Sequence, residues 1–284
     1  MRRCLIALVL LTLAMATSAA RAEDFEPDRV DIEYVAPTSA DMQPVYDMVM
    51  KAHVLERIKS MLTPFRLPRR LLVKTQSCNG DANAWYDNDV VVVCYEFIDD
   101  VWKKVPENTT PAGVTPIDAM VGPVIDAFLH EAGHAVFDMW KVPILGREED
   151  AADYFSAYLM LQFNKEEARR LILGTIYQYR DAVKAKKEVT FPLHKMADEH
   201  GMPAQRFYNV LCIAYGSDDQ LFADFVSKGY LPKARASDCK DEYKQEAYAF
   251  DKLLKPHIEP ELEERLYEHK LPPPDRKPMR RQAR

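Results

Sequence analysis

The stretch Ile125 to Met139, IDAFLHEAGHAVFDM, predicts the buried helix around which the rest of the fold is arranged. Its apolar side chains fall at positions 125, 128, 129, 132, 135, 136 and 139, which is the spacing of one helical face. The same pattern extends the predicted helix over about residues 117–139. His130 and His134 are four residues apart, so both imidazoles lie on one side of this helix. Glycine at position 133 favours close packing against a neighbouring helix, despite a cost of up to about 1 kcal/mol in helix propensity.

Two histidines at this spacing predict a zinc site. A catalytic zinc ion takes three protein ligands and keeps an open position for water. His130 and His134 would supply two ligands. Glu131 is offset by about a third of a turn, so its carboxylate lies beside the ion and can act as general base on the water.

The third ligand is predicted at the start of the next helix. Pro143 and Gly146 interrupt the chain, and a second helix over about 147–163 can then return against the first. Glu149 and Asp153 are four residues apart on that helix. We predict Glu149 as a ligand and Asp153 as the acceptor of a ring N–H from a ligating histidine. Glu148 and Asp150 are the alternatives.

An additional donor would be needed for the negative charge that develops on a carbonyl oxygen during hydrolysis. Four side chains gather in the segment 198–216 and are candidates for this role. They are His200, Arg206, Tyr208 and Tyr215. An ordinary structural role is the alternative for each of them.

The remaining pattern predicts an α+β fold, mainly helical, with a small β-sheet next to the helix that carries the histidines. Strands are predicted at about 70–76 and 90–95, and the four valines Val90 to Val93 favour a strand covered on both faces. Other helices are predicted over about 42–62, 96–105, 165–186, 203–215, 218–228 and 240–254.

The ends of the chain differ from its body. Residues 1–22 open with two arginines close to the start, continue with a short apolar run and end in Ala20-Arg21-Ala22, as in a signal peptide cleaved near Ala22. Residues 23–41 are expected to form a lead-in segment, 42–268 a single domain, and 269–284 a basic, proline-rich, disordered tail. No later stretch is apolar over the roughly 18 residues that a membrane span needs. We expect a secreted or periplasmic protein.

Charge and cysteines restrict the partners and the compartment. The formal net charge is −6, and removal of residues 1–22, with three arginines and no acid, would make it −9. Nucleic acid is therefore not an expected partner, because phosphate binding depends on clustered lysine and arginine. Four cysteines remain, and an even count in an exported chain predicts two disulfides, most simply Cys78–Cys94 and Cys212–Cys239. Zinc ligation by these thiols is the alternative.

Several stretches resemble a family of secreted bacterial proteins described as metallopeptidases of unknown function, and more broadly the gluzincin group of zinc peptidases. They are SCNGDANAWYDNDVVVVCYEF from Ser77, HEAGHAVFD from His130, GREEDAADYFSAYLM from Gly146, QRFYNVLCIAYGSDD from Gln205 and LPKARASDC from Leu231. The resemblance implies peptide hydrolysis. In gluzincin-like enzymes an extended substrate pairs with the edge strand of a small sheet, and Ala82 to Asp87 is the corresponding stretch by analogy.

The residues therefore favour an exported zinc metallopeptidase acting on a peptide or protein substrate, with Glu131 as general base. One alternative is a zinc-bearing binding or regulatory protein of the cell envelope without turnover, although Glu131 is intact. A second is a deformylase-like hydrolase, which would need a cysteine as the third ligand.

Overall fold

The computed structural model describes residues 29–184 and 197–260; the predicted signal peptide and the tail at 269–284 lie outside these ranges. The strands are β1 Val30–Tyr34, β2 Leu71–Gln76, β3 Ala84–Asp87 and β4 Val90–Cys94. The helices are α1 Gln43–Lys51, α2 Val54–Leu62, α3 Tyr95–Lys103, α4 Pro116–Trp140, α5 Glu148–Leu161, α6 Lys165–Gln178, α7 Arg180–Lys184, α9 Pro203–Ser217, α10 Ala223–Ser227, α11 Lys233–Leu253 and the 3₁₀ turn η1 Lys255–His257. The predicted α+β class, mainly helical with a small sheet, is confirmed.

The four strands form one mixed sheet in the order β1-β2-β4-β3. β1, β2 and β4 are parallel, whereas β3 is antiparallel to β4 and forms an edge of the sheet. Val91, Val92 and Val93 of β4 are buried, as expected for a strand covered on both faces. The short turn at Asn88 and Asp89, both with positive φ, brings β3 back along β4.

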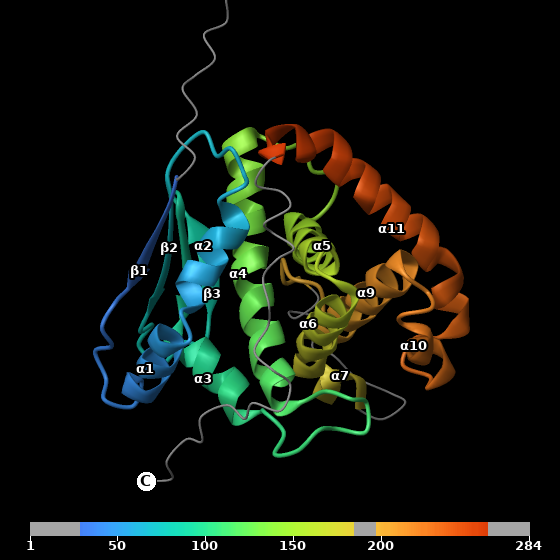
Figure 1. The fold of residues 1–284 in the computed structure, drawn as a ribbon, viewed down its shortest axis with the longest axis horizontal. Helices are drawn as coiled ribbons and strands as arrows, with labels where there is room; N and C mark the ends of the chain where they lie inside the picture. The colour runs from blue at the N-terminus through green and yellow to red at the C-terminus, as the bar shows by residue number, and fades with distance from the viewer. Residues whose placement is uncertain (1–28, 185–196, 261–284) are drawn as a thin grey trace, which may run out of the picture.

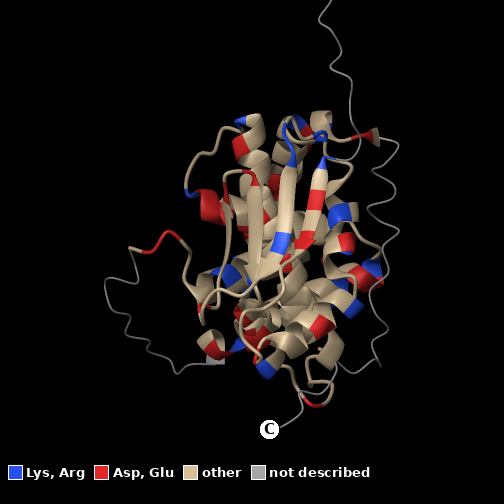
Figure 2. Ribbon diagram, turned by 90° about the vertical axis from the view of Figure 1, so that its left-hand side faces the viewer, with Lys and Arg blue, Asp and Glu red and all other residues tan. Residues whose placement is uncertain are grey.

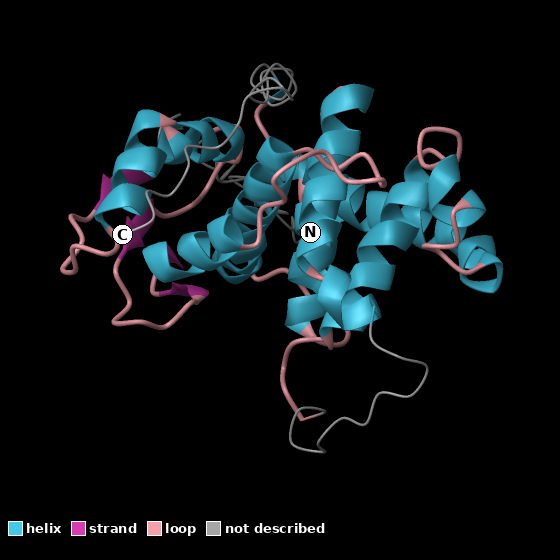
Figure 3. Ribbon diagram, turned by 90° about the horizontal axis from the view of Figure 1, so that it is seen from below, coloured by secondary structure: helices cyan, strands magenta, loops and turns pink. Residues whose placement is uncertain are grey.

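Helix α4 lies between the sheet, with its neighbours α1 to α3, and the helices that follow α4 in the chain (Figure 1). β3 and β4 pack against one side of it, and α5 and α6 pack against another. The strands occupy one end of the molecule, and helices make up the rest (Figure 3). Charged residues of both signs are interspersed on the side shown in Figure 2. Because α4 contacts both parts, its side chains are placed to form a site at their junction.

The local sequence explains where α4 begins and ends. Thr115 caps its first turn by accepting a hydrogen bond from the backbone N–H of Asp118, at 3.2 Å, and Pro116 occupies the first helical position. Lys141 ends the helix in a left-handed conformation with φ of 53°. Gly146, with φ of 123°, then redirects the chain into α5. The predicted break between the two helices therefore returns α5 against α4.

Glycines allow the neighbouring helices to approach α4 closely. A β-carbon built on Gly174 of α6 would lie 2.0 Å from the carbonyl oxygen of Asp118. One built on Gly133 would lie 3.1 Å from the ring of Phe155 and 3.4 Å from Ala152, both on α5. The expected role of Gly133 in packing against the next helix agrees with this contact.

The structure differs from the sequence prediction at several boundaries. Residues 30–34, placed in the lead-in segment, form β1 and pair with β2, because Val30 is buried in the core and its neighbours alternate outward. The helix predicted over 42–62 is divided at His53, which has φ of 51°. The helix predicted over 165–186 is divided at Tyr179, and the helix predicted over 218–228 is shortened to α10. The helix predicted over 240–254 begins seven residues earlier, at Lys233.

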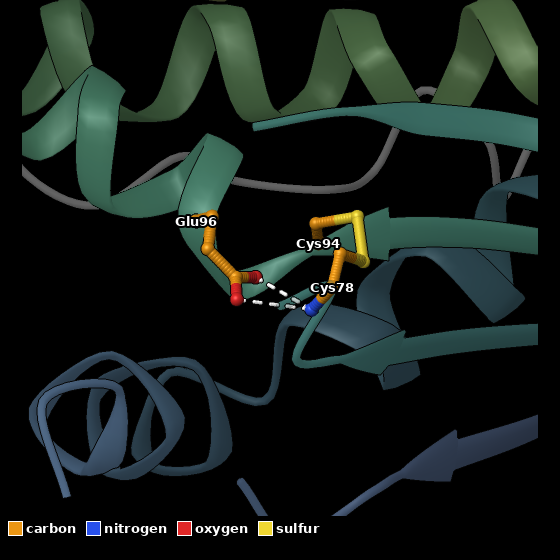
Figure 4. A group of neighbouring side chains, drawn as sticks. All are labelled: Cys78, Cys94 and Glu96. Atoms are coloured by element: carbon orange, nitrogen blue, oxygen red, sulfur yellow. Dashed lines mark hydrogen bonds between the residues drawn. A yellow bond between two sulfur atoms is a disulfide. The ribbon is translucent and has the colours of Figure 1, made fainter. Parts of the chain in front are cut away.

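Both predicted disulfides are confirmed. Cys78–Cys94 joins the segment after β2 to the end of β4, and Cys212–Cys239 joins α9 to α11. The carboxylate of Glu96 accepts a hydrogen bond from the backbone N–H of Cys78 at 2.9 Å (Figure 4). It accepts another from the backbone N–H of Gly80 at 3.1 Å. Zinc ligation by these cysteines is thereby excluded, since their sulfur atoms are bonded to each other. Within residues 29–184 and 197–260, no helix has the length and apolar character required to cross a membrane.

Candidate metal centre

Three side chains converge where α4 meets α5. The Nε2 atoms of His130 and His134 are 3.3 Å apart. Glu149, in the first turn of α5, places one carboxylate oxygen 3.0 Å from Nε2 of His130 and the other 3.4 Å from Nε2 of His134. The first turn of α5 carries three acidic residues, which suits the positive end of a helix. The structure therefore brings together the two histidines and the carboxylate that the sequence analysis selected as ligands.

The second ring nitrogen of each histidine is also occupied. Nδ1 of His130 lies 2.9 Å from Asp153, and Nδ1 of His134 lies 2.8 Å from Glu148. A carboxylate at Nδ1 holds the proton there and leaves the lone pair of Nε2 free for a metal ion. Asp153 has the predicted orienting geometry. Glu148, considered as an alternative ligand, instead faces Nδ1 of His134, and Asp150 pairs with Arg147 at 2.9 Å.

Arg206 of α9 holds Asp153 from the other side. Its Nε donates to one carboxylate oxygen at 2.8 Å and its Nη2 to the other. The guanidinium lies over the ring of Tyr179, with 5.5 Å to the centroid. Arg206 was predicted either as a donor to the carbonyl oxygen or as a structural residue. Because Asp153 engages two nitrogens of the guanidinium, the structure favours the structural role.

His200 approaches from the loop that precedes α9. Its Nε2 is 2.9 Å from a carboxylate oxygen of Glu149, and its ring stacks on that of His130 with centroids 6.1 Å apart. Asp198 accepts a hydrogen bond from its backbone N–H at 3.0 Å and lies 3.4 Å from its Nδ1. His130, Glu149 and His200 form a group that could hold a metal ion. His200 thus lies beside the predicted ligands, whereas Tyr208 and Tyr215 are absent from the lining of the adjoining cavity.

A cavity of about 140 Å³ adjoins these residues. Its lining comes from the segment leading into β3, from α3, α4, α6 and α9, and from the His200 loop. The lining residues are Ala82, Asn83, Ala84, Phe97, Pro123, Asp126, Ala127, His130, Glu131, Gln178, Tyr179, His200 and Arg206. The sequence analysis missed Asp126, although it precedes His130 by one helical turn and therefore shares its face. Its carboxylate is buried and accepts a hydrogen bond from Ser156 at 2.7 Å.

Glu131 faces this cavity with 7% of its surface exposed. Within residues 29–184 and 197–260, its carboxylate forms no hydrogen bond or ion pair with another side chain. Burial raises the pKa of Glu131, although the nearby His130 and His134 oppose the shift. An unengaged carboxylate of raised pKa is suited to accept and release a proton near neutral pH.

The charges around the histidines favour a bound cation. Burial alone would lower the pKa of His130, but hydrogen bonds to Asp153 and Glu149 outweigh it and raise this pKa to about 10. Burial would also raise the pKa of Glu149, yet its contacts with His130, His134 and His200 lower it well below its usual range. The site is therefore rich in carboxylate charge, which a divalent cation can balance as effectively as protons on the imidazoles.

The donor atoms fit a zinc ion. Zinc forms bonds of about 2.0–2.1 Å to imidazole nitrogen and carboxylate oxygen and prefers a tetrahedral arrangement, in which neighbouring ligand atoms are about 3.3 Å apart. The Nε2 atoms of His130 and His134 are 3.3 Å apart, and they lie 3.0 and 3.4 Å from the Oε2 and Oε1 atoms of Glu149, respectively. Two imidazoles and one carboxylate are also a common ligand set of catalytic zinc.

A helix with two histidines, a facing carboxylate and an unengaged glutamate is the arrangement expected of a metal-dependent hydrolase centre. The chain belongs to a family described as "Putative metallopeptidase", whose model matches residues 34–254. This match covers all the residues of the centre and both disulfides. No match was found among curated proteins or among solved structures.

Proposed function

We propose that the protein is an exported zinc metallopeptidase that hydrolyses peptide bonds. The observation that carries this proposal is the convergence of His130, His134 and Glu149, with the carboxylate of Glu131 unengaged in the adjoining cavity. Membership of a metallopeptidase family supports the reaction class. Two disulfides are typical of oxidising compartments and, together with the signal-like residues 1–22, support export.

A zinc ion held by His130, His134 and Glu149 would supply Lewis-acid polarisation of the scissile carbonyl and a lowered pKa for the attacking water. Glu131 takes a proton from that water at its carboxylate as the water attacks the carbonyl carbon. The same carboxylate then returns the proton to the departing amine nitrogen. Its burial matches this role, because a raised pKa makes both transfers possible near neutral pH.

Among the four predicted donors, His200 is best placed to stabilise charge on the carbonyl oxygen. Its ring lies beside the ligand group and lines the cavity with Glu131. The hydrogen bond to Glu149 raises the pKa of His200 and so favours the protonated ring, which donates from Nε2 as well as from the Nδ1 that faces Asp198. Hydrogen bonds that strengthen as negative charge develops lower the barrier for acyl transfer.

The substrate backbone is proposed to extend along β3. This strand forms the sheet edge, has β4 as its one paired strand, and contributes Ala84 to the cavity lining together with the preceding Asn83. An extended peptide can add to such an edge through backbone hydrogen bonds. The scissile bond would then cross the cavity in front of Glu131.

The proposal is tested by digesting an unbiased peptide library with the zinc-loaded protein and with its Glu131→Gln variant. Zinc content and affinity are measured for both proteins. Cleavage by the wild type, reduced at least about 100-fold in the variant with zinc retained, is expected for loss of the general base. Glu166→Gln, an exposed glutamate on α6, is the matched control.

Zinc binding without cleavage by either protein would contradict the enzyme and favour a binding or regulatory protein. Failure of both proteins to bind zinc would contradict the metal centre itself. Equal cleavage by wild type and Glu131→Gln would remove Glu131 from its proposed role.

A further inference from the structure

A second cavity, of about 270 Å³, continues from the first. The two cavities share lining residues from four parts of the chain. These are Ala82, Phe97, Pro123, Gln178 and Tyr179. Because the shared residues border both spaces, the second cavity adjoins the space in which a molecule bound at the metal centre would lie.

The walls of the second cavity come from three helical regions. α3 contributes Phe97 and Val101, α4 contributes Ala119 and Pro123, and the end of α6 contributes Tyr177. Val101 and Ala119 are 8% and 2% exposed, so these parts of the wall are fixed by core packing. Apolar and aromatic carbon therefore surrounds most of the space, which favours an apolar occupant.

Two of the three charged residues that line this cavity, Arg180 and Asp100, are engaged with other groups of the protein. The guanidinium of Arg180 lies 4.0 Å over the ring of Tyr177 and donates to the carbonyl of Tyr177 at 3.1 Å. Asp100 pairs with Lys103 at 3.3 Å. Lys104 is exposed, at the outer part of the lining. The charges thus lie at a polar rim rather than forming a buried ion-binding site.

The volume is sufficient for a large side chain. An apolar protein cavity of about 150 Å³ accommodates a benzene ring, and the second cavity is larger, at about 270 Å³. Fully burying a side chain such as leucine or phenylalanine strengthens binding by roughly 10- to 100-fold relative to leaving it exposed. An alanine or glycine at the same place would leave most of the cavity unfilled.

Resting on the proposed peptidase function, we infer that the second cavity is the specificity pocket of this enzyme and receives an aromatic or long aliphatic side chain next to the scissile bond. Val101 of α3 and Ala119 of α4 line the second cavity but not the first, and Phe97 borders both cavities. The substrate class is accordingly peptides with a large apolar residue adjoining the cleaved bond.

The test uses two substitutions with opposite effects at one position. Val101→Trp fills the cavity and is expected to shift cleavage of a peptide library toward small residues at the adjoining position. Val101→Ala enlarges the cavity and is expected to shift cleavage toward tryptophan and phenylalanine. Val91→Ala, the same change at a buried position of β4 outside the lining, is the control and should leave the preference unchanged. A general loss of folding cannot produce shifts in two directions.

A binding measurement separates this inference from the proposed function. Two small hydroxamates that differ in a benzyl or a methyl side chain are titrated calorimetrically into the zinc-loaded protein. The benzyl compound is expected to bind at least about tenfold more tightly, and Val101→Trp should abolish that difference. Equal affinities, or cleavage of peptides without preference for a large apolar residue, would overturn the pocket while leaving the peptidase in place. Absence of both cleavage and hydroxamate binding would overturn the proposed function, and the pocket with it.

Discussion

Each of the two proposed ligands His130 and His134 has a carboxylate at its second ring nitrogen, and the two carboxylates differ in their surroundings. Asp153 is buried and also held by Arg206, whereas the side chain of Glu148 is 52% exposed. A fixed partner orients an imidazole more strongly than a mobile one. The Asp153 contact should therefore contribute more to metal affinity than the Glu148 contact.

Asp153→Asn is expected to weaken zinc binding by about 10- to 100-fold. The neutral amide lacks the negative charge that orients the His130 ring and that forms an ion pair with Arg206. Competition with a chromophoric chelator measures the affinity. Asp150→Asn makes the same chemical change on the same helix, at a residue paired with Arg147, and should leave affinity within about twofold. Equal losses in the two variants would contradict an orienting role for Asp153.

The raised pKa of His130 predicts a pH dependence of the metal-free protein. Since the folded-state pKa is about 10, its stabilising contribution is complete below the unfolded value of about 6.5 and is lost as the pH rises through about 10. Urea unfolding of chelator-treated protein should show falling stability over this window. In His130→Gln this part of the pH dependence should disappear, and a wild-type curve identical to that of the variant would contradict the prediction.

At this scale the sequence predicted the residues on α4 and α5, because the spacing of four residues within a helix fixes which side chains share a face. It could not predict that Glu148 faces His134 or that Arg206 reaches Asp153. Those contacts depend on the rotation of α5 relative to α4 and on where α9 packs, and neither is encoded in a local period.

Two glycines, Gly174 of α6 and Gly133 of α4, lie where α4 packs against its neighbouring helices. Gly174→Ala should destabilise the protein by about 2–4 kcal/mol, because the added methyl would meet backbone atoms of Asp118 that cannot rotate away. Gly133→Ala should cost much less, since its nearest neighbour is the side chain of Phe155 and the change gains up to about 1 kcal/mol of helix propensity. Thermal unfolding of the two variants gives the comparison. A larger loss in Gly133→Ala would contradict backbone contact as the cause.

Helix α11 carries a glutamate that should reduce stability at neutral pH. Burial raises the pKa of Glu246 to about 7, so the stability it contributes is complete below about pH 4.5 and is lost as the pH rises through 7. Glu246→Gln is expected to raise the unfolding free energy by more than about 1 kcal/mol at pH 8 and to change little at pH 4.5. The exposed Glu166→Gln serves as control, and a gain of equal size at both pH values would contradict burial as the cause.

Elements with a long helical period were predicted correctly in type, including α4, α5 and α9. The strand β1 was missed because it has only five residues and its single partner is β2, 41 positions later in register. The interruption at His53 was also missed, because a left-handed histidine leaves the apolar spacing of α1 and α2 almost unchanged. The pairing of β1 with β2 is a tertiary contact that no local pattern encodes.

In the whole molecule, the two disulfides constrain different regions. Cys212–Cys239 closes a sequence separation of 27 residues between α9 and α11, so replacing both cysteines with serine should cost roughly 3–4 kcal/mol. Zinc affinity should be retained, since none of the three proposed ligands lies on these helices.

Replacing Cys78 and Cys94 should instead raise KM more than it lowers kcat, because that bridge holds the segment leading into β3. The two double-cysteine variants are compared by chemical denaturation, zinc titration and peptide kinetics. Equal effects of the two replacements on KM would contradict different roles for the two disulfides.

The α4–α5 pair also bears on how the protein acquires its metal. Its three proposed ligands lie between positions 130 and 149, on consecutive helices joined by a short connection. Contacts between residues so close in sequence form rapidly during folding. The parallel pairing of β1, β2 and β4 forms more slowly, because it joins segments that are distant in the sequence. An ion can thus be captured by a folding chain before the sheet is complete and before α9 places Arg206 behind Asp153. Metal supply would then determine how fast the protein matures as well as whether it is active.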